Sequence, residues 1–247
     1  MPSNRNKRKA EAEARAARKA ERKAGKRAGT RIAIDQERNE EIRSFLIVCE
    51  GKVTEPSYFE QFSLATARIE AIGEGKNTLT LVDAAIKLRD EAESAYDECW
   101  VVFDKDDFPS DDFDNAIRKA EANGLQVAYT NQAFEFWLLL HFDGHNGGGM
   151  HRDDCLVKLR KHLNAYGLDY SDDDKRVTSA IFDLFVAPTG RMREKEGTTN
   201  ELEPETNEHR AIYRAEKILG YHAGKTPAAA ESSTTVHWLV SQLNQYR

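Results

Sequence analysis

The sequence has little cysteine and no long apolar run, and these shortages exclude several classes of protein. Its 247 residues include 3 cysteines, an odd number spread widely along the chain, which argues against a disulfide framework and for a reducing compartment. We therefore predict a cytoplasmic location. No apolar stretch approaches the roughly 20 residues that a membrane-spanning helix needs, so we expect no membrane insertion. The basic N-terminal stretch lacks an apolar core, and no secretory signal is expected there.

Aromatic residues are missing from the first 31 positions, where basic residues dominate. This stretch holds 12 Lys and Arg against 3 Glu, whereas the rest of the chain carries 24 basic and 39 acidic side chains. We predict that residues 1–40 form a flexible or helical basic arm ahead of an acidic body. Its cations would contact a nucleic-acid backbone without reading sequence, and a solvated tail is the alternative. The candidate contacts in the arm are Arg5, Lys7, Arg8 and Lys9.

The sequence contains neither a complete P-loop nor a usual zinc-binding module, so we expect neither ATP hydrolysis nor a zinc site. The AGKTP stretch around Lys225 would need a glycine at position 219 to be a P-loop, but Leu219 stands there. We therefore expect this chain to hydrolyse no ATP itself. A group of histidines and a cysteine has spacings that fit no usual zinc module, so no zinc site is expected. That group is His141, His145, His151 and Cys155.

What the sequence does contain is an alternation of buried strands and helices. This order predicts an α/β fold, a mostly parallel Rossmann-like sheet with flanking helices and right-handed crossovers, over residues 41–143. Residues 144–247 predict a mainly helical region packed on this core. The expected strands are 45–49, 68–72, 99–103 and 126–130, and the expected helices are 57–65, 79–96, 111–124, 134–142, 152–166, 173–186, 207–220 and 231–246. A polar loop over 189–200 carries Arg191 and Arg193, which would contact nucleic acid unless the loop is a linker.

Acidic residues follow two of the expected strands at the point where each strand ends. Glu50 comes after residues 45–49, and Asp104, Asp106 and Asp107 come at the end of 99–103. If these strands are neighbours in a parallel sheet, their acids meet at one edge, where ligands of such sheets bind. Close carboxylates repel one another unless a cation lies between them, and oxygen ligands of this kind suit Mg²⁺ or Mn²⁺. Helix caps and solvated turns are the alternative roles for such acids.

Further candidates lie beside these acids. Gly51 would allow a backbone or a phosphate to approach, and Lys52 would neutralise a phosphate or simply face solvent. Glu55 would support the site or favour the following helix N-terminus. Glu135 lies in a strongly apolar helix, where an unpaired acid is costly to bury, so we expect a metal or a basic partner for it or, alternatively, an exposed helical stripe.

Three motifs together resemble a known family. The stretch CEGKVTEPSYF, followed about fifty residues later by VVFDKDDF, resembles the RloB-like family, which is associated with abortive phage resistance. The stretch NQAFEFWLLLHF resembles the next motif of that family, with Asn131, Glu135 and His141 as its marked polar residues. SSTTVHWLV near the C-terminus resembles a further segment, although the Asn-Pro expected before it reads Ala230-Glu231.

The resemblance implies a Toprim-type catalytic core, in which Glu50, Asp104 and Asp106 match the family pattern of catalytic and metal-binding acids. Asp107 is then a reserve metal ligand. The implied activity is Mg²⁺- or Mn²⁺-dependent cleavage of DNA or RNA in anti-phage defence, with a separate ATPase as the partner. The alternative function is a non-catalytic regulatory or scaffold subunit of a defence complex that binds nucleic acid or a partner protein.

Overall fold

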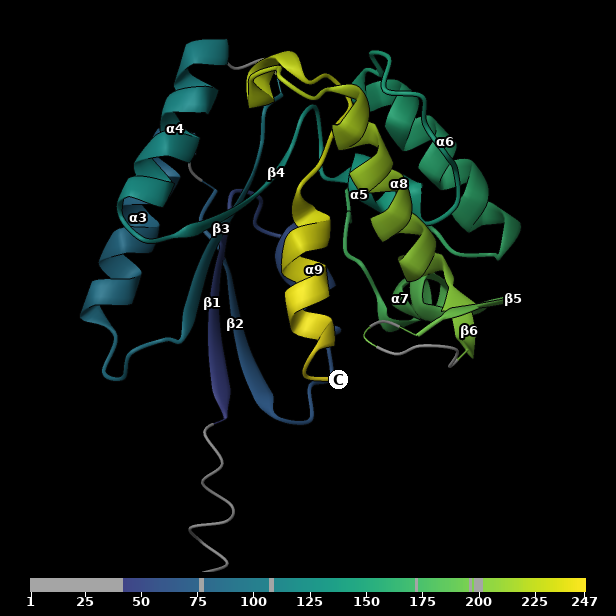
Figure 1. Cartoon of the computed structure of the whole chain (residues 1–247), viewed down its shortest axis with the longest axis horizontal. Coiled ribbons are helices and arrows are strands. Elements are labelled where there is room, and N and C mark those ends of the chain that lie inside the picture. Colours follow the sequence, from purple (N-terminus) through teal and green to yellow (C-terminus); the bar gives the residue numbers. More distant parts are fainter. Residues whose placement is uncertain (1–41, 76–77, 107–108, 172, 196, 198–201) are drawn as a thin grey trace, which may run out of the picture. The chain divides into compact units, whose positions relative to one another are not determined.

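The computed structural model describes residues 42–75, 78–106, 109–171, 173–195, 197 and 202–247. Residues Arg43–Arg247 form one compact unit, to which the following account applies (Figure 1). None of the helices in these described ranges combines the length and the apolar character needed to cross a membrane. All three cysteines are buried and free.

The core of the unit is a parallel four-stranded sheet with the strand order β2-β1-β3-β4. The sheet confirms the predicted α/β fold, since β2, β3 and β4 each follow a helix that returns the chain to the end of the sheet where its strands begin. Its elements are β1 (Arg43–Cys49), α2 (Thr54–Phe59), β2 (Ala67–Gly73), α3 (Thr78–Glu91), β3 (Glu98–Asp104), α4 (Ser110–Ala122) and β4 (Gln126–Thr130).

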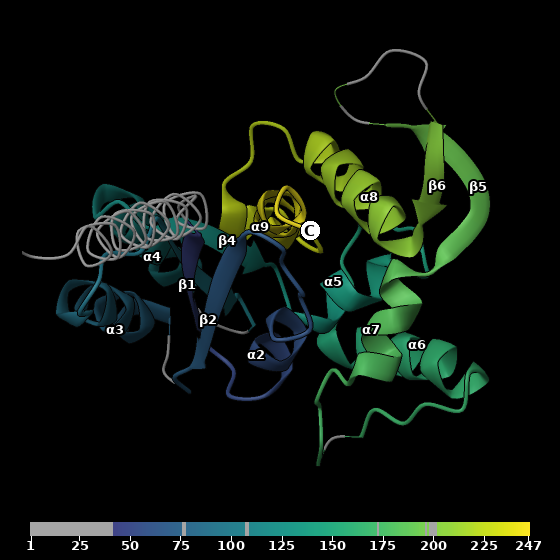
Figure 2. The same ribbon diagram turned by 90° about the horizontal axis from the view of Figure 1, so that it is seen from below.

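Both faces of the sheet are covered, which explains why its central strands are almost continuously apolar. Alternate residues of β1 point to opposite faces: Phe45 and Ile47 pack with α2 and the later helices, whereas Leu46 and Val48 pack with α3 and α4. In Figure 2, α3 and α4 lie on one side of the strands, while α2 and α9 lie on the other. Phe45 through Cys49 are each at most 1% exposed.

The second half of the unit is mainly helical and shares a hydrophobic cluster with the sheet. Its elements are α5 (Glu135–Leu140), α6 (Arg152–Ala165), α7 (Ser179–Val186), β5 (Pro188–Glu194), β6 (Leu202–Thr206), α8 (Asn207–Tyr221), the short 3₁₀ helix η1 (Pro227–Ala229) and α9 (Val236–Asn244). Tyr58 of α2 is completely buried and makes edge contacts with the rings of Phe134 and Phe182. Aromatic packing thus joins α2 to the residue just before α5 and to α7.

Three expectations about this half need correction. The helix predicted over 173–186 begins only at Ser179, where the Thr178 side chain caps it. Part of the predicted loop 189–200 is a strand, because β5 pairs with β6 in an antiparallel hairpin. No alternating apolar pattern marks these two strands in the sequence, because most of their side chains are exposed. The helix predicted over 231–246 begins only at Val236, since the preceding residues bond to β4 instead. Thr234 forms an antiparallel bridge with Thr130, and Thr235 exchanges backbone and side-chain hydrogen bonds with Tyr129.

Candidate metal and active site at the carboxyl end of the sheet

Glu50 and Asp104 are brought together by neighbouring strands. Strands β1 and β3 are paired in parallel, and the Glu50 backbone N–H continues their ladder by donating to the carbonyl of Val102 at 2.9 Å. The Glu50 carboxylate in turn accepts a hydrogen bond from the Asp104 backbone N–H at 3.2 Å. The two acids therefore lie side by side where the strands end, as the sequence predicts.

The Asp104 carboxylate is held on one side and free on the other. Its Oδ2 accepts a hydrogen bond from the Phe134 backbone N–H at 2.9 Å, which fixes the side chain beneath the loop after β4. Its Oδ1 is buried and has no hydrogen-bond partner within the described ranges. Burial raises the pKa of Asp104 well above its usual range, and the nearby Glu55 and Glu135 raise it further. A buried carboxylate oxygen without a donor is costly unless a cation or a proton meets it.

Glu55 lies inside the site, although it comes from the first turn of α2. It is 4% exposed and accepts a hydrogen bond from the Gly51 backbone N–H at 3.0 Å. Burial raises its pKa, and Glu135 and Asp106 add to this effect by repulsion. This placement also revises the role expected for Gly51: a Cβ there would meet the Glu55 carboxylate, with its Cδ at 2.8 Å, so the glycine admits this side chain rather than a phosphate.

A Gly51→Ala substitution should therefore disturb the site directly. The added methyl collides with the Glu55 carboxylate, which can turn aside but loses its hydrogen bond from the Gly51 N–H, so we expect the free energy of unfolding to fall by about 1 kcal/mol. Gly220→Ala is the matched control, because a Cβ at that helical position meets no atom within 4 Å and alanine favours helices. Chemical denaturation of both variants measures the difference. Equal stability of the two variants would contradict the placement of Glu55.

Glu135, the first residue of α5, is the third buried acid. It is 5% exposed, and its Oε1 lies 3.1 Å from the Nζ of Lys175. The Tyr170 hydroxyl lies at 3.5 Å from the same oxygen. Of the two alternatives for this residue, the structure thus gives a buried acid with a basic partner and not an exposed stripe. Lys175 neutralises the charge that would otherwise be very unfavourable in this apolar helix.

Asp106 forms an ion pair with Arg152 at the start of α6, with Oδ1 and Nη1 2.5 Å apart. Its backbone has a φ of 43°, and its N–H donates to the carbonyl of Gln132, which has a φ of 104°. Aspartate adopts the left-handed region more readily than most residues, whereas a φ of 104° is strained for glutamine, and such strain is concentrated where a protein must place functional groups. The loops after β3 and β4 are therefore tied together in a strained arrangement around Asp104.

The pKa of Glu50 is raised to about 7, mainly by burial and also by Asp106 and Glu55, against the hydrogen bond from Asp104. Glu50 therefore exchanges its proton near neutral pH. Because its pKa is higher in the folded state than in the unfolded chain, the folded protein binds more protons between about pH 4.5 and 7. Ionisation of Glu50 thus lowers stability as the pH rises through this window.

Glu50→Gln should accordingly stabilise the metal-free protein at pH 8. We expect a gain of about 1–2 kcal/mol, discounted from the full linkage energy because the side chain keeps some contact with solvent. The gain should shrink as the pH falls from 7 toward 4.5, where the unfolded chain is protonated too. Thermal unfolding in EDTA at several pH values measures it. A gain that does not change with pH would mean that the Glu50 pKa is normal.

The donors at this edge suit a hard divalent cation, but they do not form a closed metal cage. Within the described ranges, which leave out Asp107, no three His, Cys, Asp or Glu side chains are placed to hold one ion. Mg²⁺ does not require such a set, because it usually keeps several waters and is held by one or two carboxylates with substrate phosphates. Glu50 and the free Oδ1 of Asp104 meet that requirement. Asp106 is paired with Arg152 through its Oδ1, so only its other carboxylate oxygen could join them without disturbing this ion pair.

A family model described as RloB-like protein matches residues 45–243. The chain belongs to the RloB-like family. This family is associated with phage defence, and the match extends over every described acid discussed above. No curated protein and no solved structure was found to match the chain.

Two marked residues of the RloB-like motif after β4 have mainly structural contacts. The side chain of Asn131 is completely buried and donates to the carbonyls of Pro227 and Ala228, so it anchors η1. His141 is 1% exposed, and its Nδ1 lies near the carbonyls of Trp137 and Leu138. Burial lowers the pKa of His141 to about 3, so this imidazole is neutral.

The remaining candidates lie elsewhere. Lys52 is exposed on the loop after β1. Arg193 pairs with Glu203 across the β5–β6 hairpin at 2.7 Å, and Arg191 is exposed on the same strand. Asp107 and the arm, with Arg5, Lys7, Arg8 and Lys9, lie outside the described residues.

Sequence reasoning missed the two cations that neutralise the acids. Arg152 and Lys175 lie 46 and 40 residues from their partners Asp106 and Glu135, and nothing in the local pattern connects them. The only available signal was the presence of Glu135 in an apolar helix, which called for a basic partner without saying which one. The site therefore consists of mutually repelling carboxylates with two cations at its border.

Proposed function

We propose that this RloB-like protein is a Mg²⁺- or Mn²⁺-dependent nuclease of anti-phage defence that cleaves DNA or RNA phosphodiesters with a Toprim-type set of acids. The observation that supports this most is the pair of carboxylates at the ends of β1 and β3. Glu50 accepts a hydrogen bond from the backbone of Asp104, and Asp104 keeps a buried oxygen without a donor. A scaffold needs no such costly pair, whereas a metal-dependent enzyme does.

Glu50 is the candidate for moving the proton. A group with a pKa of about 7 takes up and releases protons near neutral pH, which suits a general base for the attacking water or a general acid for the leaving oxygen. Asp104 is fixed by the Phe134 N–H, so its Oδ1 keeps one direction. Arg152, which borders the acids through Asp106, offers a planar guanidinium suited to a phosphate oxygen.

Asp104 and Asp106 would hold the divalent cation, and Glu50 would be a further ligand as the alternative to its role in proton transfer. When bound, such an ion polarises the phosphodiester, stabilises the leaving oxygen and lowers the pKa of a bound water. The buried acids Glu55 and Glu135 keep the local potential negative, which favours cation binding at this edge. The resemblance to the RloB-like family implies a separate ATPase as the partner, and the sequence of this chain contains no complete P-loop of its own.

The experiment that tests this function is a cleavage assay with the purified protein, alone and with its cognate ATPase. Mixed single- and double-stranded DNA and RNA are incubated with Mg²⁺, with Mn²⁺ or with EDTA. We expect cleavage with either ion and none in EDTA. Inactivity toward all substrates, with and without the ATPase, would overturn the proposal and favour the scaffold role. Cleavage in EDTA at an unchanged rate would exclude the metal-dependent mechanism.

A further inference from the structure

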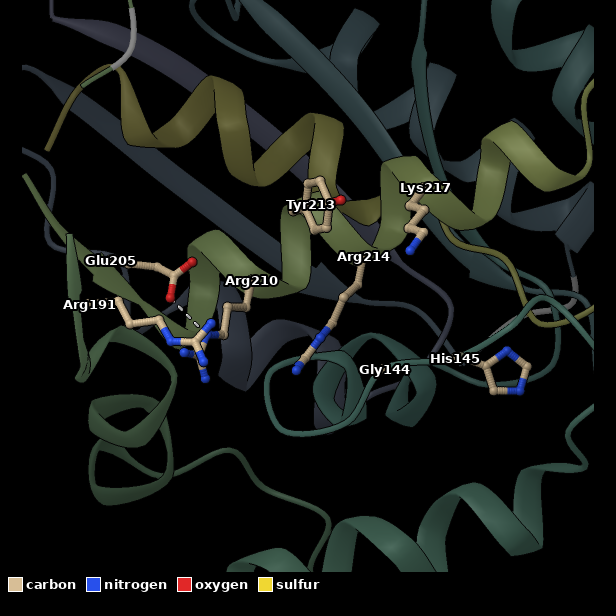
Figure 3. Close-up of a pocket in the computed structure, with 8 residues that line it drawn as sticks. All are labelled: Gly144, His145, Arg191, Glu205, Arg210, Tyr213, Arg214 and Lys217. Carbon is tan, nitrogen blue, oxygen red and sulfur yellow. Dashed lines mark hydrogen bonds and ion pairs between the residues drawn. The ribbon is translucent and has the colours of Figure 1, made fainter. Parts of the chain in front are cut away.

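Helix α8 borders a groove that lies outside the acidic site. Two adjoining hollows, of about 410 and 780 Å³, share Gly144, His145 and Lys217. Figure 3 shows the first hollow: Arg214 and Lys217 of α8 extend toward the side on which Gly144 and His145 lie, Arg210 lies beside Glu205 and Arg191, and the ring of Tyr213 extends to the other side of the helix. Its lining residues are Gly144, His145, Arg191, Glu205, Arg210, Tyr213, Arg214 and Lys217.

The first hollow is strongly basic. Four Lys and Arg side chains line it with one acid, Glu205, which already pairs with Arg210 at 2.9 Å and accepts a hydrogen bond from Thr189 at 2.8 Å. Arg214 is half-buried, and burial and the neighbouring Arg210 both lower its pKa, which means that the two guanidinium charges repel each other. An anion that entered between these cations would relieve the repulsion.

Exposed aromatic rings accompany the cations on the same face of α8. Tyr213 is 64% exposed and Tyr221 is 51% exposed, which is unusual for rings of this size. Tyr213, Lys217 and Tyr221 are spaced four residues apart and therefore share one helix face. The Lys217 Nζ lies 6.0 Å from the centroid of the Tyr221 ring. Flat rings alternating with cations form a surface on which unpaired bases stack while their phosphates are neutralised.

The groove is also connected to the acidic site. Glu135 is the first residue of α5, and Gly144 and His145 follow the end of that helix. The six residues of α5 span roughly 9 Å at 1.5 Å per residue, which is short on the scale of a nucleic-acid strand. Arg152 continues the same stretch of chain from the groove back to Asp106. The groove and two charged residues of the acidic site, Glu135 and Arg152, are thus carried by one continuous stretch of chain.

We propose that the α8 groove binds single-stranded nucleic acid, with Arg191, Arg210, Arg214 and Lys217 on the phosphates and Tyr213 and Tyr221 stacked on the bases. This inference names the substrate class of the nuclease function proposed above. It rests on that function only for the claim that the bound strand is then cleaved. Binding itself requires neither the acids nor a metal. Single strands are favoured over duplexes because ring stacking needs unpaired bases.

Binding is tested by fluorescence anisotropy with labelled, unstructured DNA and RNA oligonucleotides of about 15 nucleotides, in EDTA to prevent cleavage. Arg191→Glu combined with Lys217→Glu should weaken binding more than about 10-fold and reduce the slope of log K against log salt by about 1.4, or 0.7 for each phosphate contact. Tyr213→Ala combined with Tyr221→Ala should weaken binding about 10- to 100-fold without changing that slope. All four side chains are exposed, so the fold should survive.

The matched control is Lys87→Glu combined with Arg118→Glu, which makes the same charge change at exposed positions of α3 and α4. This control should bind like the wild type. Equal losses in the groove and control variants would overturn the proposal, as would duplex binding as tight as that of single strands. Asp104→Asn should bind the oligonucleotides as tightly as the wild type does. A variant that binds them but no longer cleaves has a defect in the acidic site alone. A variant that no longer binds them has a defect in the groove alone.

Discussion

The Asp104→Asn variant is expected to keep its fold and to lose cleavage by about 10²–10³-fold, which corresponds to about 3–4 kcal/mol of lost transition-state stabilisation. Asparagine has nearly the same shape and retains an oxygen for the Phe134 N–H. It removes the negative charge that would hold the cation. It also removes a buried carboxylate whose pKa is raised, so stability in EDTA at pH 8 should stay the same or increase.

The control for this prediction is Asp97→Asn, the same change just before the opposite end of β3. Asp97 is bonded to the backbone N–H and the hydroxyl of Ser44, which lowers its pKa. This substitution should reduce stability modestly and leave cleavage within about 2-fold of the wild type. The measurement is the initial cleavage rate at saturating Mg²⁺. If Asp104→Asn cleaves at the wild-type rate, the proposed site is wrong.

Arg247→Ala should be among the most destabilising single substitutions. Glu208 of α8 is 2% exposed, and its two carboxylate oxygens accept hydrogen bonds from Arg247 at 2.8 and 3.1 Å. The guanidinium also lies 4.4 Å from the centroid of the Phe62 ring. Truncation of Arg247 leaves a buried charge that retains one amide donor, from Asn244, so we expect about 3–5 kcal/mol less stability. For a chain of this size that is a loss of roughly 10 °C in Tm.

A double substitution separates the ion pair from simple loss of packing. Glu208→Leu combined with Arg247→Met replaces both charges with apolar groups, so it should cost less than Arg247→Ala alone. Thermal and urea unfolding at pH 7 measure both variants. A cost below about 1 kcal/mol for Arg247→Ala would show that water reaches Glu208 and that the pair is a weak surface interaction.

The sheet could be predicted because burial on both faces leaves a strong mark on the sequence. Residues 45–49 and 99–103 are nearly continuous apolar runs, and their parallel pairing placed Glu50 beside Asp104. The β5–β6 hairpin could not be predicted in the same way, because its pairing depends on backbone hydrogen bonds while its side chains face solvent. Residues 231–235 resembled a helix, but their backbone and hydroxyl groups bond to β4.

The candidate site was predictable in its acids and not in what surrounds them. The ends of β1 and β3 fix the positions of Glu50 and Asp104. Arg152 and Lys175 reach their partners only through the packing of α6 and of the segment before α7. Gly51 was recognised as a position that needs space, but its occupant is the Glu55 carboxylate from the next helical turn. Contacts of this kind depend on side-chain packing that a linear pattern does not encode.

The bonding of residues 227–235 to the end of β4 determines how much of the chain must be synthesised before the acidic site can form. Thr235 bonds to Tyr129 and Asn131 bonds to Pro227, so both hold the end of β4 just before the turn that presents the Phe134 N–H to Asp104. These contacts join residues about a hundred positions apart, so a ribosome must deliver nearly the whole RloB-like segment before Asp104 is fixed in place. An unfinished chain would carry the acids without their final arrangement. For the nuclease proposed above, activity would then begin only on a nearly complete chain.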